Sequence, residues 1–342
     1  MNAHLKLLIK KLSTLSLSLL LFLFLHSQFP ILHSPLSNLN CVYAASPSLT
    51  IQPSLLQIKS NPPAEINVPF TLSNPSTDTL TLKILFKRFR DEGTQTGKIV
   101  YSLPSLTDER SQDPFLQSVE IVDDGIPLYN LILSPNQQKQ LSLRIKIEET
   151  APEADHYFSV IFQTTTDNKP NLVDPNASFS QVEAGIALPV LLSIHAPNYL
   201  GATIDTFSSP LVMESGPLPL TVKIKNPSEH FVTAKGTIFI SNMFGQTVGR
   251  IDIPPTNILA NTTRLLTNFN SDYQQPKVIW DERFLLGLYQ AKLSIIISPD
   301  KILYTRYLYF AAFPFIWLAS LVVGCLAGFF ILRRIKNKVS NE

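Results

Sequence analysis

The sequence contains few cysteines, histidines and glycines, and each shortage excludes a class of site. Only two of its 342 residues are cysteine, Cys41 and Cys325, and they lie near opposite ends. The region between them can form no internal disulfide and no zinc or iron–sulfur site with thiolate ligands. That region has three histidines, His156, His195 and His230, none in a metal-binding spacing, and its glycines form no nucleotide-binding loop. We therefore expect no enzyme, no catalytic residue, no metal and no cofactor.

The chain also lacks a strong excess of charge of either sign. It has 28 Lys and Arg against 26 Asp and Glu, but residues 1–45 hold three of the lysines. The tail after Leu332 holds four more basic residues and a single acid, Glu342. Removing both ends leaves 21 basic against 25 acidic residues, so the central region is mildly acidic. Such a balance argues against nucleic acid as a partner.

The two ends of the chain contain the only long hydrophobic runs. From Tyr307 to Leu332 no residue is charged, and the basic residues between Arg333 and Lys338 follow directly. A run beyond about 18 apolar residues can cross the ~30 Å hydrocarbon core as a helix, and Lys and Arg mark its cytoplasmic end. We expect a transmembrane helix over residues 307–332, a cytoplasmic tail over residues 333–342, and the preceding region outside the cell.

The N-terminus has the pattern of a secretory leader. Three lysines within residues 1–11 precede an apolar run from Leu12 to Leu25, and Val42-Tyr43-Ala44 suits signal peptidase. The interval between run and cleavage site is long, so residues 1–45 are either a signal peptide or an uncleaved signal anchor. Either form exports the same region, which predicts a single-pass protein of the cell membrane.

The C-terminal run contains a pair of small residues suited to helix packing. Gly324 and Gly328 form a Gly-x-x-x-Gly pattern, which lets two helix backbones approach closely. They are candidate contacts of a homodimer through the span, although single spans also carry the pattern without dimerising. The absence of a Leu-Pro-x-Thr-Gly sorting signal indicates that the protein stays in the membrane.

Short alternating segments separated by turn signals fill the central region. Leu141–Ile147 and Tyr289–Ile297 alternate apolar and polar residues with the period of a half-buried strand. The chain has 26 prolines and 12 glycines, a composition that favours β-sheets with proline-containing turns over helical bundles. The predicted fold is all-β, with two tandem immunoglobulin-like β-sandwiches over residues 46–197 and 198–306.

Two pairs of segments indicate that the sandwiches follow one plan. Phe70–Ser76 resembles Val222–Ser228, since both are strands that end in Asn-Pro-Ser, and His156–Phe162 resembles Leu288–Ser294. Spacing then predicts an insertion in the first copy, within residues 104–127. Chance similarity between β-proteins is the alternative. Tyrosines near the start of the second pair are expected to be corner residues that bond back to the chain: Tyr157 and Tyr289.

The arrangement of turns and strands also resembles a bacterial family. In the first half, proline turns precede the strand at Leu141 and the tyrosine at position 157. In the second half, Asn226–Ser228, Phe244-Gly245 and Leu286–Tyr289 complete the pattern. These features resemble single-span bacterial surface proteins, including the WxL-interacting proteins of Gram-positive envelopes. The resemblance covers most of residues 46–338 and implies an ectodomain that binds other surface proteins and the wall, without matching any single binding residue.

One basic group in the central region is a candidate ligand contact. It comprises Lys87, Arg88 and Arg90 with Phe89 between them, and it is expected at an exposed hairpin tip. An anion or glycan could bind there. The alternative is a solvated strand end whose lysine prevents edge-to-edge aggregation. The inserted segment is a second candidate, and deletion of residues 111–118 is expected to weaken partner binding and to leave the fold intact.

The resulting functional hypothesis is a membrane-anchored bacterial surface protein that binds another envelope protein or a cell-wall polymer. Two other classes stay open. A glycan-acting enzyme would require two facing carboxylates in a cleft. A chaperone-like module would require a long unpaired apolar strand edge. The second sandwich is expected to rest on the membrane beneath the first.

Overall fold

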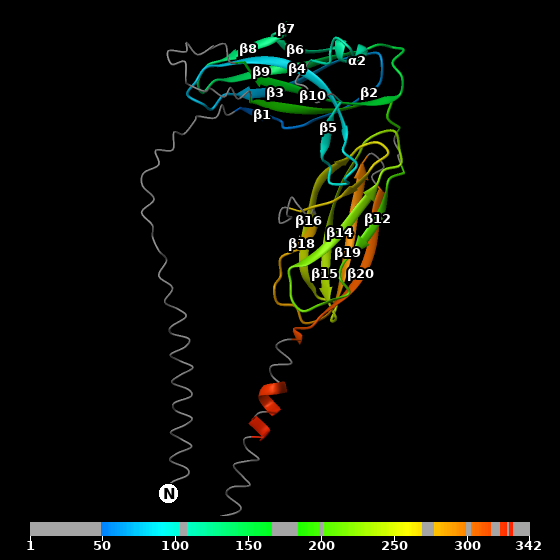
Figure 1. Cartoon of the computed structure of the whole chain (residues 1–342). Helices are drawn as coiled ribbons and strands as arrows, with labels where there is room; N and C mark the ends of the chain where they lie inside the picture. Colours follow the sequence, from blue (N-terminus) through cyan, green and yellow to red (C-terminus); the bar gives the residue numbers. More distant parts are fainter. Residues whose placement is uncertain are drawn as a thin grey trace, which may run out of the picture. The chain divides into compact units, whose positions relative to one another are not determined.

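The computed structural model describes residues 49–102, 108–165, 184–197, 201–268, 277–298, 302–315, 322–326 and 328–330 (Figure 1). The predicted leader lies outside these residues. Strands dominate the described part of the chain and form two β-sandwiches of immunoglobulin-like type. The all-β prediction is therefore confirmed.

The first sandwich consists of two packed sheets. One has the strand order β1-β3-β9-β6-β7, and the other has the order β2-β11-β10-β4-β5, with β8 also paired to β4. Between β5 and β6 lies the short helix α2 (Pro114–Gln117), which is capped by Asp113. The strands are β1 (Thr50–Gln52), β2 (Leu56–Ser60), β3 (Ala64–Ser73), β4 (Leu80–Asp91), β5 (Ile99–Tyr101), β6 (Val119–Asp123), β7 (Ile126–Leu128), β8 (Asn130–Leu133), β9 (Gln138–Ile147), β10 (Ala154–Thr164) and β11 (Gly185–Ile194).

The second sandwich repeats this plan with fewer strands. One sheet has the order β12-β14-β17, with β18 also paired to β14, and the other has the order β13-β20-β19-β15-β16. The strands are β12 (Thr203–Ser208), β13 (Val212–Met213), β14 (Leu218–Lys225), β15 (Val232–Asn242), β16 (Thr247–Ile258), β17 (Thr263–Leu265), β18 (Val278–Trp280), β19 (Gly287–Ser298) and β20 (Ile302–Ala312).

Alternating side chains build both cores. In β9 the apolar positions from Leu141 to Ile147 are buried, and in β19 the positions from Ala291 to Ile297 are buried. Residues two apart on a strand face the same side of the sheet, so each strand gives one apolar face to its core. The period-two prediction for these strands is confirmed.

The first two strands of each sandwich pair in the same way in both copies. β1 pairs with β3 and β12 pairs with β14, both antiparallel. The chain then changes sheets, so that β2 runs parallel to β11 and β13 runs parallel to β20. The first sandwich additionally places β6 beside β9 and β7 beside β6, largely within the predicted insertion. The structure thus supports a common plan with extra strands in the first copy.

Equivalent asparagines hold the same turn in both copies. Asn74 and Asn226 follow β3 and β14 and are buried. Each side-chain amide donates to three backbone carbonyls, and each side-chain oxygen accepts the backbone N–H and the hydroxyl of a serine two residues later. A buried polar side chain is retained only when its hydrogen bonds are made, which explains why Asn-Pro-Ser recurs.

The C-terminal prediction requires a correction. Residues 307–312 belong to β20 and pair with β19 in an unbroken register that ends at Ala312 opposite Gly287. The predicted helix is therefore wrong over Tyr307–Ala312, because an apolar run rich in aromatic residues also satisfies a strand. Residues 322–326 and 328–330 are helical and contain Gly324 and Gly328. None of the helical segments that the structure describes has the length and apolar character of a membrane span.

Candidate binding surface

The predicted basic group does not form an exposed cluster. Lys87 and Phe89 are buried in β4, so the expected position at a hairpin tip is wrong. The Lys87 ammonium lies 5.6 Å from the centre of the Tyr101 ring. Arg88 forms an ion pair with Asp113, whereas Arg90 is exposed. Strand β4 continues past the basic residues and stays paired with β5 up to Asp91, opposite Ile99. The tip of the β4–β5 hairpin therefore lies beyond Asp91.

Arg88 belongs to a compact polar cluster with the inserted segment. Its guanidinium contacts Asp113 and lies 5.5 Å from the centre of the Phe115 ring, which stacks on His156 at 3.7 Å. Burial and then the charge of Arg88 lower the pKa of His156 to about 4. Leu116 is fully buried in the core. The segment is thus a structural part of the sandwich, and the expectation that deleting residues 111–118 leaves the fold intact is not supported.

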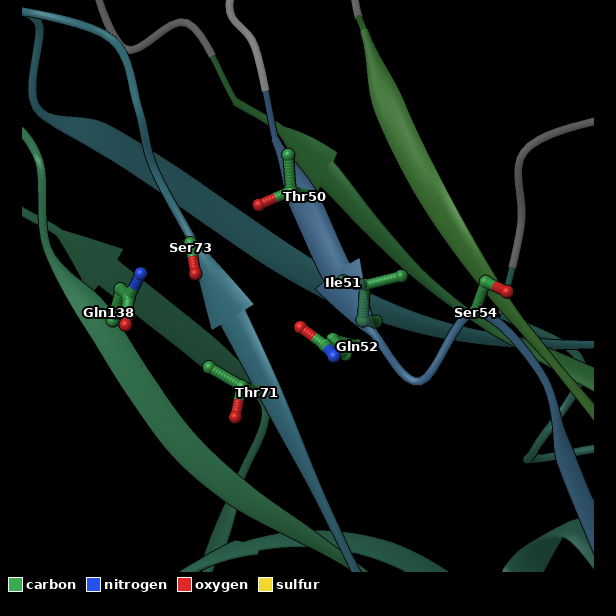
Figure 2. A pocket seen from close by; sticks show the side chains of 7 residues that line it. All are labelled: Thr50, Ile51, Gln52, Ser54, Thr71, Ser73 and Gln138. Carbon is green, nitrogen blue, oxygen red and sulfur yellow. The ribbon is translucent and has the colours of Figure 1, made fainter.

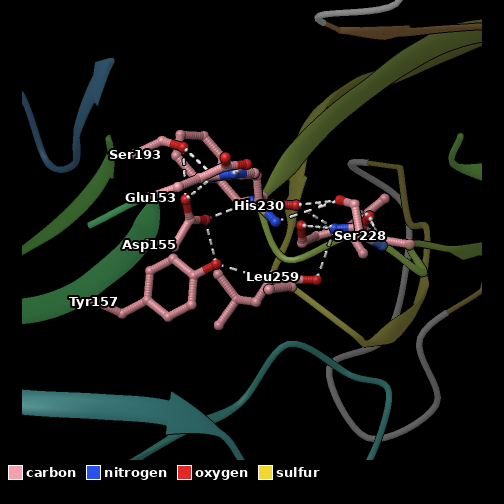
Figure 3. Close-up of polar contacts among 11 residues, drawn as sticks. Glu153, Asp155, Tyr157, Ser193, Ser228, His230 and Leu259 are labelled. Atoms are coloured by element: carbon pink, nitrogen blue, oxygen red, sulfur yellow. Dashed lines mark hydrogen bonds and ion pairs between the residues drawn. The ribbon is translucent and has the colours of Figure 1, made fainter. Parts of the chain in front are cut away.

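A second polar cluster joins the two sandwiches (Figure 3). Nδ1 of His230 lies 2.7 Å from Oδ1 of Asp155, and its Nε2 lies 2.9 Å from Oε1 of Glu153. The hydroxyl of Ser193 donates to the same Asp155 oxygen at 2.6 Å. Burial alone would lower the pKa of His230, but the hydrogen bonds and charges of Glu153 and Asp155 raise it.

Asp155 uses its second oxygen to fix the same junction. Oδ2 accepts the backbone N–H of Phe231 at 2.6 Å and the hydroxyl of Tyr157 at 2.5 Å. The Tyr157 oxygen in turn accepts the N–H of Ala260 in the second sandwich. Burial and the charge of Asp155 raise the pKa of Tyr157 far above its usual range. Two carboxylates therefore meet at His230, where they bind across the junction.

Apolar side chains complete the junction. Phe89 and Leu191 of the first sandwich pack with Phe231 and Leu259 of the second, and all four are buried. Beside them the β4–β5 hairpin reaches the second sandwich, where the carbonyl of Gln95 accepts the N–H of Leu265. Sequence reasoning missed this junction, because its residues are separated by up to 170 positions and show no shared motif.

The described surface includes two cavities of similar volume. One, of about 410 Å³, is lined by hydroxyl, amide and aliphatic side chains of β1, β3 and β9 (Figure 2). Its lining holds no ionisable side chain, so it offers no acid–base chemistry. The other, of about 380 Å³, lies at the junction beside Phe89, Leu259 and Arg264. Among the residues that the structure describes, no group of three or more His, Cys, Asp or Glu side chains suits a metal ion.

The most distinctive surface is the outer edge of β20. β19 pairs with one side of β20 along its whole length, but β13 covers the other side only at Ala311 and Ala312. Within the described ranges, no strand pairs with that side of Ile302–Phe310. We call this stretch the open edge. Its N–H and C=O groups are available for an added strand.

The orientation of the open-edge groups follows from its final residues. The N–H of Ala311 donates to Leu211 and the N–H of Phe313 donates to Met213, so odd-numbered amides point away from β19. The pairing with β19 has no register shift, and backbone groups alternate sides along a strand. The N–H and C=O groups that face outward are therefore those of Leu303, Thr305, Tyr307 and Tyr309.

Most side chains of the open edge are apolar or aromatic, and Arg306 is its one charged residue. Leu303 is 59% exposed, Tyr307 is 55% exposed and Tyr309 is 66% exposed. Tyr307 lies 5.9 Å from the ammonium of Lys292, and the Tyr309 hydroxyl accepts a hydrogen bond from Gln290. Both rings therefore contact side chains of β19 and remain exposed, so they can pack against side chains of a bound segment.

Other long edges carry features that prevent pairing. β16 contains consecutive prolines at positions 254 and 255 and two register shifts against β15. β12 contains a register shift at Asp205. Prolines and bulges are the usual protection of edge strands, and the open edge of β20 has neither. Sequence analysis named a long apolar edge as a discriminating feature but assigned its second half to a helix.

Comparisons with known proteins give no family. No family model matches the chain, and no curated protein matches it. Solved structures similar to it include the chaperone–tip adhesin complex of CFA/I fimbriae (13% identity, 78% of this chain and 98% of that one, TM-score 0.35). The CupB2 chaperone of Pseudomonas aeruginosa is also similar (9% identity, 77% and 100% covered, TM-score 0.36). The resemblance to WxL-interacting proteins finds no support among these comparisons.

Proposed function

We propose that this chain is an exported binding protein that captures an extended segment of another envelope protein at the open edge of β20. The observation that carries the proposal is the uncovered Ile302–Phe310 edge with its outward N–H and C=O groups. A segment that adds to such an edge gains main-chain hydrogen bonds, and its alternate side chains pack on the sheet face. The ligand should therefore be an extended peptide with apolar residues at every second position.

Anchoring in a membrane is the second part of the proposal, and it is supported by the sequence. After β20 ends, 20 uncharged residues extend from Phe313 to Leu332, and basic residues follow. Phe313 and Pro314 are not helical, and a helix from Phe315 to Leu332 would be about 27 Å long at ~1.5 Å per residue, close to the ~30 Å hydrocarbon core. The proposed span thus begins after Ala312 and not at Tyr307, with the binding edge on the outer side.

A proline substitution in β20 tests peptide binding at the open edge and keeps the hydrogen bonds between β20 and β19. The N–H of Thr305 faces outward, so Thr305→Pro removes one donor for the ligand and keeps the bonds to β19. Thr305→Val is the matched control, since it changes the same side chain but keeps the backbone N–H. The probe is a set of twelve-residue peptides selected by phage display on the full chain in detergent.

The expected result is a clear separation between the two variants. Thr305→Pro should weaken peptide binding by about tenfold or more, because one hydrogen bond is lost and the ring blocks close approach. Thr305→Val should bind within about twofold of the wild type. Equal binding by all three proteins would contradict the proposal, provided that their melting temperatures agree.

A further inference from the structure

The end of the second sandwich where β20 terminates carries an unusual number of exposed apolar side chains. They lie in four separate segments: the β12–β13 connection with the start of β13, the β15–β16 turn, the β18–β19 loop with the start of β19, and the residues after β20 (Figure 1). We call these side chains the apolar rim. They are Leu211, Val212, Met243, Phe244, Phe284, Leu286, Leu288, Phe313 and Phe315, with exposed fractions from 39% to 78%.

Backbone contacts bring these loops to one end. Gly287 pairs with Ala312, and a Cβ added at Gly287 would lie 2.8 Å from Cε of Met243. The N–H of Phe313 donates to Met213, and the N–H of Gly216 donates to Arg283 in the β18–β19 loop. The rim therefore surrounds the point at which the chain leaves the sandwich.

We infer that the apolar rim inserts into the interface of a lipid bilayer. The inference rests on the proposed membrane anchor and names the surface that meets the membrane. Only the 20 uncharged residues from Phe313 to Leu332 separate β20 from the basic tail, which is about the number that crosses the hydrocarbon core, so little chain is left as a spacer after Ala312. Loops beside Phe313 must then lie at headgroup depth, where exposed Phe, Leu and Met side chains gain by leaving water.

Charged residues at the rim indicate a shallow position. Asp281, Glu282 and Arg283 precede Phe284, and all three are exposed. The Glu282 carboxylate accepts the N–H groups of Arg283 and Phe284, so it folds back onto its own loop. This arrangement leaves Phe284 and Leu286 as the protruding side chains of the loop and keeps the charges at its border.

Fluorescence quenching by brominated lipids tests the inference in the full chain. Trp317→Phe removes the tryptophan of the predicted span, and buried Trp280 remains as a background common to reporter and control. Phe244→Trp then places a reporter on the rim. Ile126→Trp in the same background is the control, because Ile126 is 67% exposed on the first sandwich. The protein is reconstituted into phosphatidylcholine vesicles with and without bromine on the acyl chains.

The expected result is loss of emission from the tryptophan introduced at position 244 and unchanged emission from the control. Flotation and alkaline carbonate extraction separate the outcomes. If the protein floats and resists carbonate but shows no quenching at position 244, insertion of the apolar rim is contradicted and the transmembrane anchor is supported. If position 244 is quenched but carbonate extracts all of the protein, insertion of the apolar rim is supported and the transmembrane anchor is contradicted. Protein that neither floats nor shows quenching would contradict both.

Discussion

His230 is a residue whose protonation affects the junction of the two sandwiches. Its ring binds Asp155 and Glu153 and is almost fully buried, so a charged imidazole between two carboxylates is favoured. Nothing in the sequence around His230 indicates this role. The partners lie more than 70 positions away, on a strand of the other sandwich.

The contribution of His230 to stability should therefore fall as pH rises. Its pKa in the folded protein is raised above 6.5, so the folded state binds the proton more tightly than the unfolded chain. The contribution is complete below about pH 6.5 and is lost as pH rises through the raised folded pKa.

Urea unfolding of the wild type and of His230→Gln across this range would measure that contribution. The difference between the two proteins should shrink with rising pH, and the opposite titration of His156 cancels in the comparison. A constant difference would refute this role of His230.

Asn74 and Asn226 should each contribute much more to the free energy of unfolding than a surface residue does. Replacing either by alanine removes three hydrogen bonds to backbone carbonyls and the two bonds that its oxygen accepts, which should cost about 3 kcal/mol of unfolding free energy. Ser76→Ala is the control, because it removes a single hydroxyl from the same turn and should cost about 1 kcal/mol. Similar losses for Asn74→Ala and Ser76→Ala in urea titrations would contradict the assigned role.

At the scale of elements, the strand β20 explains both the success and the failure of sequence reasoning. Its first residues, Ile302–Arg306, lie within the range predicted for the second sandwich, which ended at residue 306. From Tyr307 onward the run is uniformly apolar, and periodicity cannot distinguish a buried helix from a strand in such a run. Residues 307–312 form a strand because they pair with β19, and a pattern in the local sequence does not reveal that pairing.

Lys87 illustrates a related limit. A basic run normally indicates a solvated strand end, yet Lys87 is 1% exposed. Its burial depends on the ring of Tyr101 from the next strand, which lies over the ammonium. Alternation in β9 and β19 was predictable because one face of each meets the core, whereas the environment of Lys87 is created by tertiary contacts.

Proline scanning can test the orientation of the groups in β20. Thr305→Pro should cost less than about 1 kcal/mol of unfolding free energy, because it removes an outward N–H. Arg306→Pro should cost about 3 kcal/mol, because the N–H of Arg306 faces β19. Urea unfolding should therefore show a larger loss of unfolding free energy for Arg306→Pro than for Thr305→Pro. A greater loss for Thr305→Pro would mean that the edge faces the other way.

At the scale of the whole molecule, the junction should couple the two sandwiches. The buried cluster of Phe89, Leu191, Phe231 and Leu259 links their cores, so the full chain should unfold in a single calorimetric transition. Phe231→Ala removes the central ring and should separate the unfolding of the sandwiches into two transitions. Exposed Phe239→Ala is the control and should leave one transition. Two transitions in the wild type would show that the sandwiches are uncoupled.

The capture of a peptide at the open edge is tested most directly by site-resolved amide hydrogen exchange. In the free protein the amides of Leu303, Thr305, Tyr307 and Tyr309 should exchange fast, while those of the even-numbered residues between them are protected by β19. Adding a selected peptide should slow exchange at the four odd-numbered amides and leave the even-numbered ones unchanged. Fast exchange at all four amides in the saturated complex would contradict strand addition at β20.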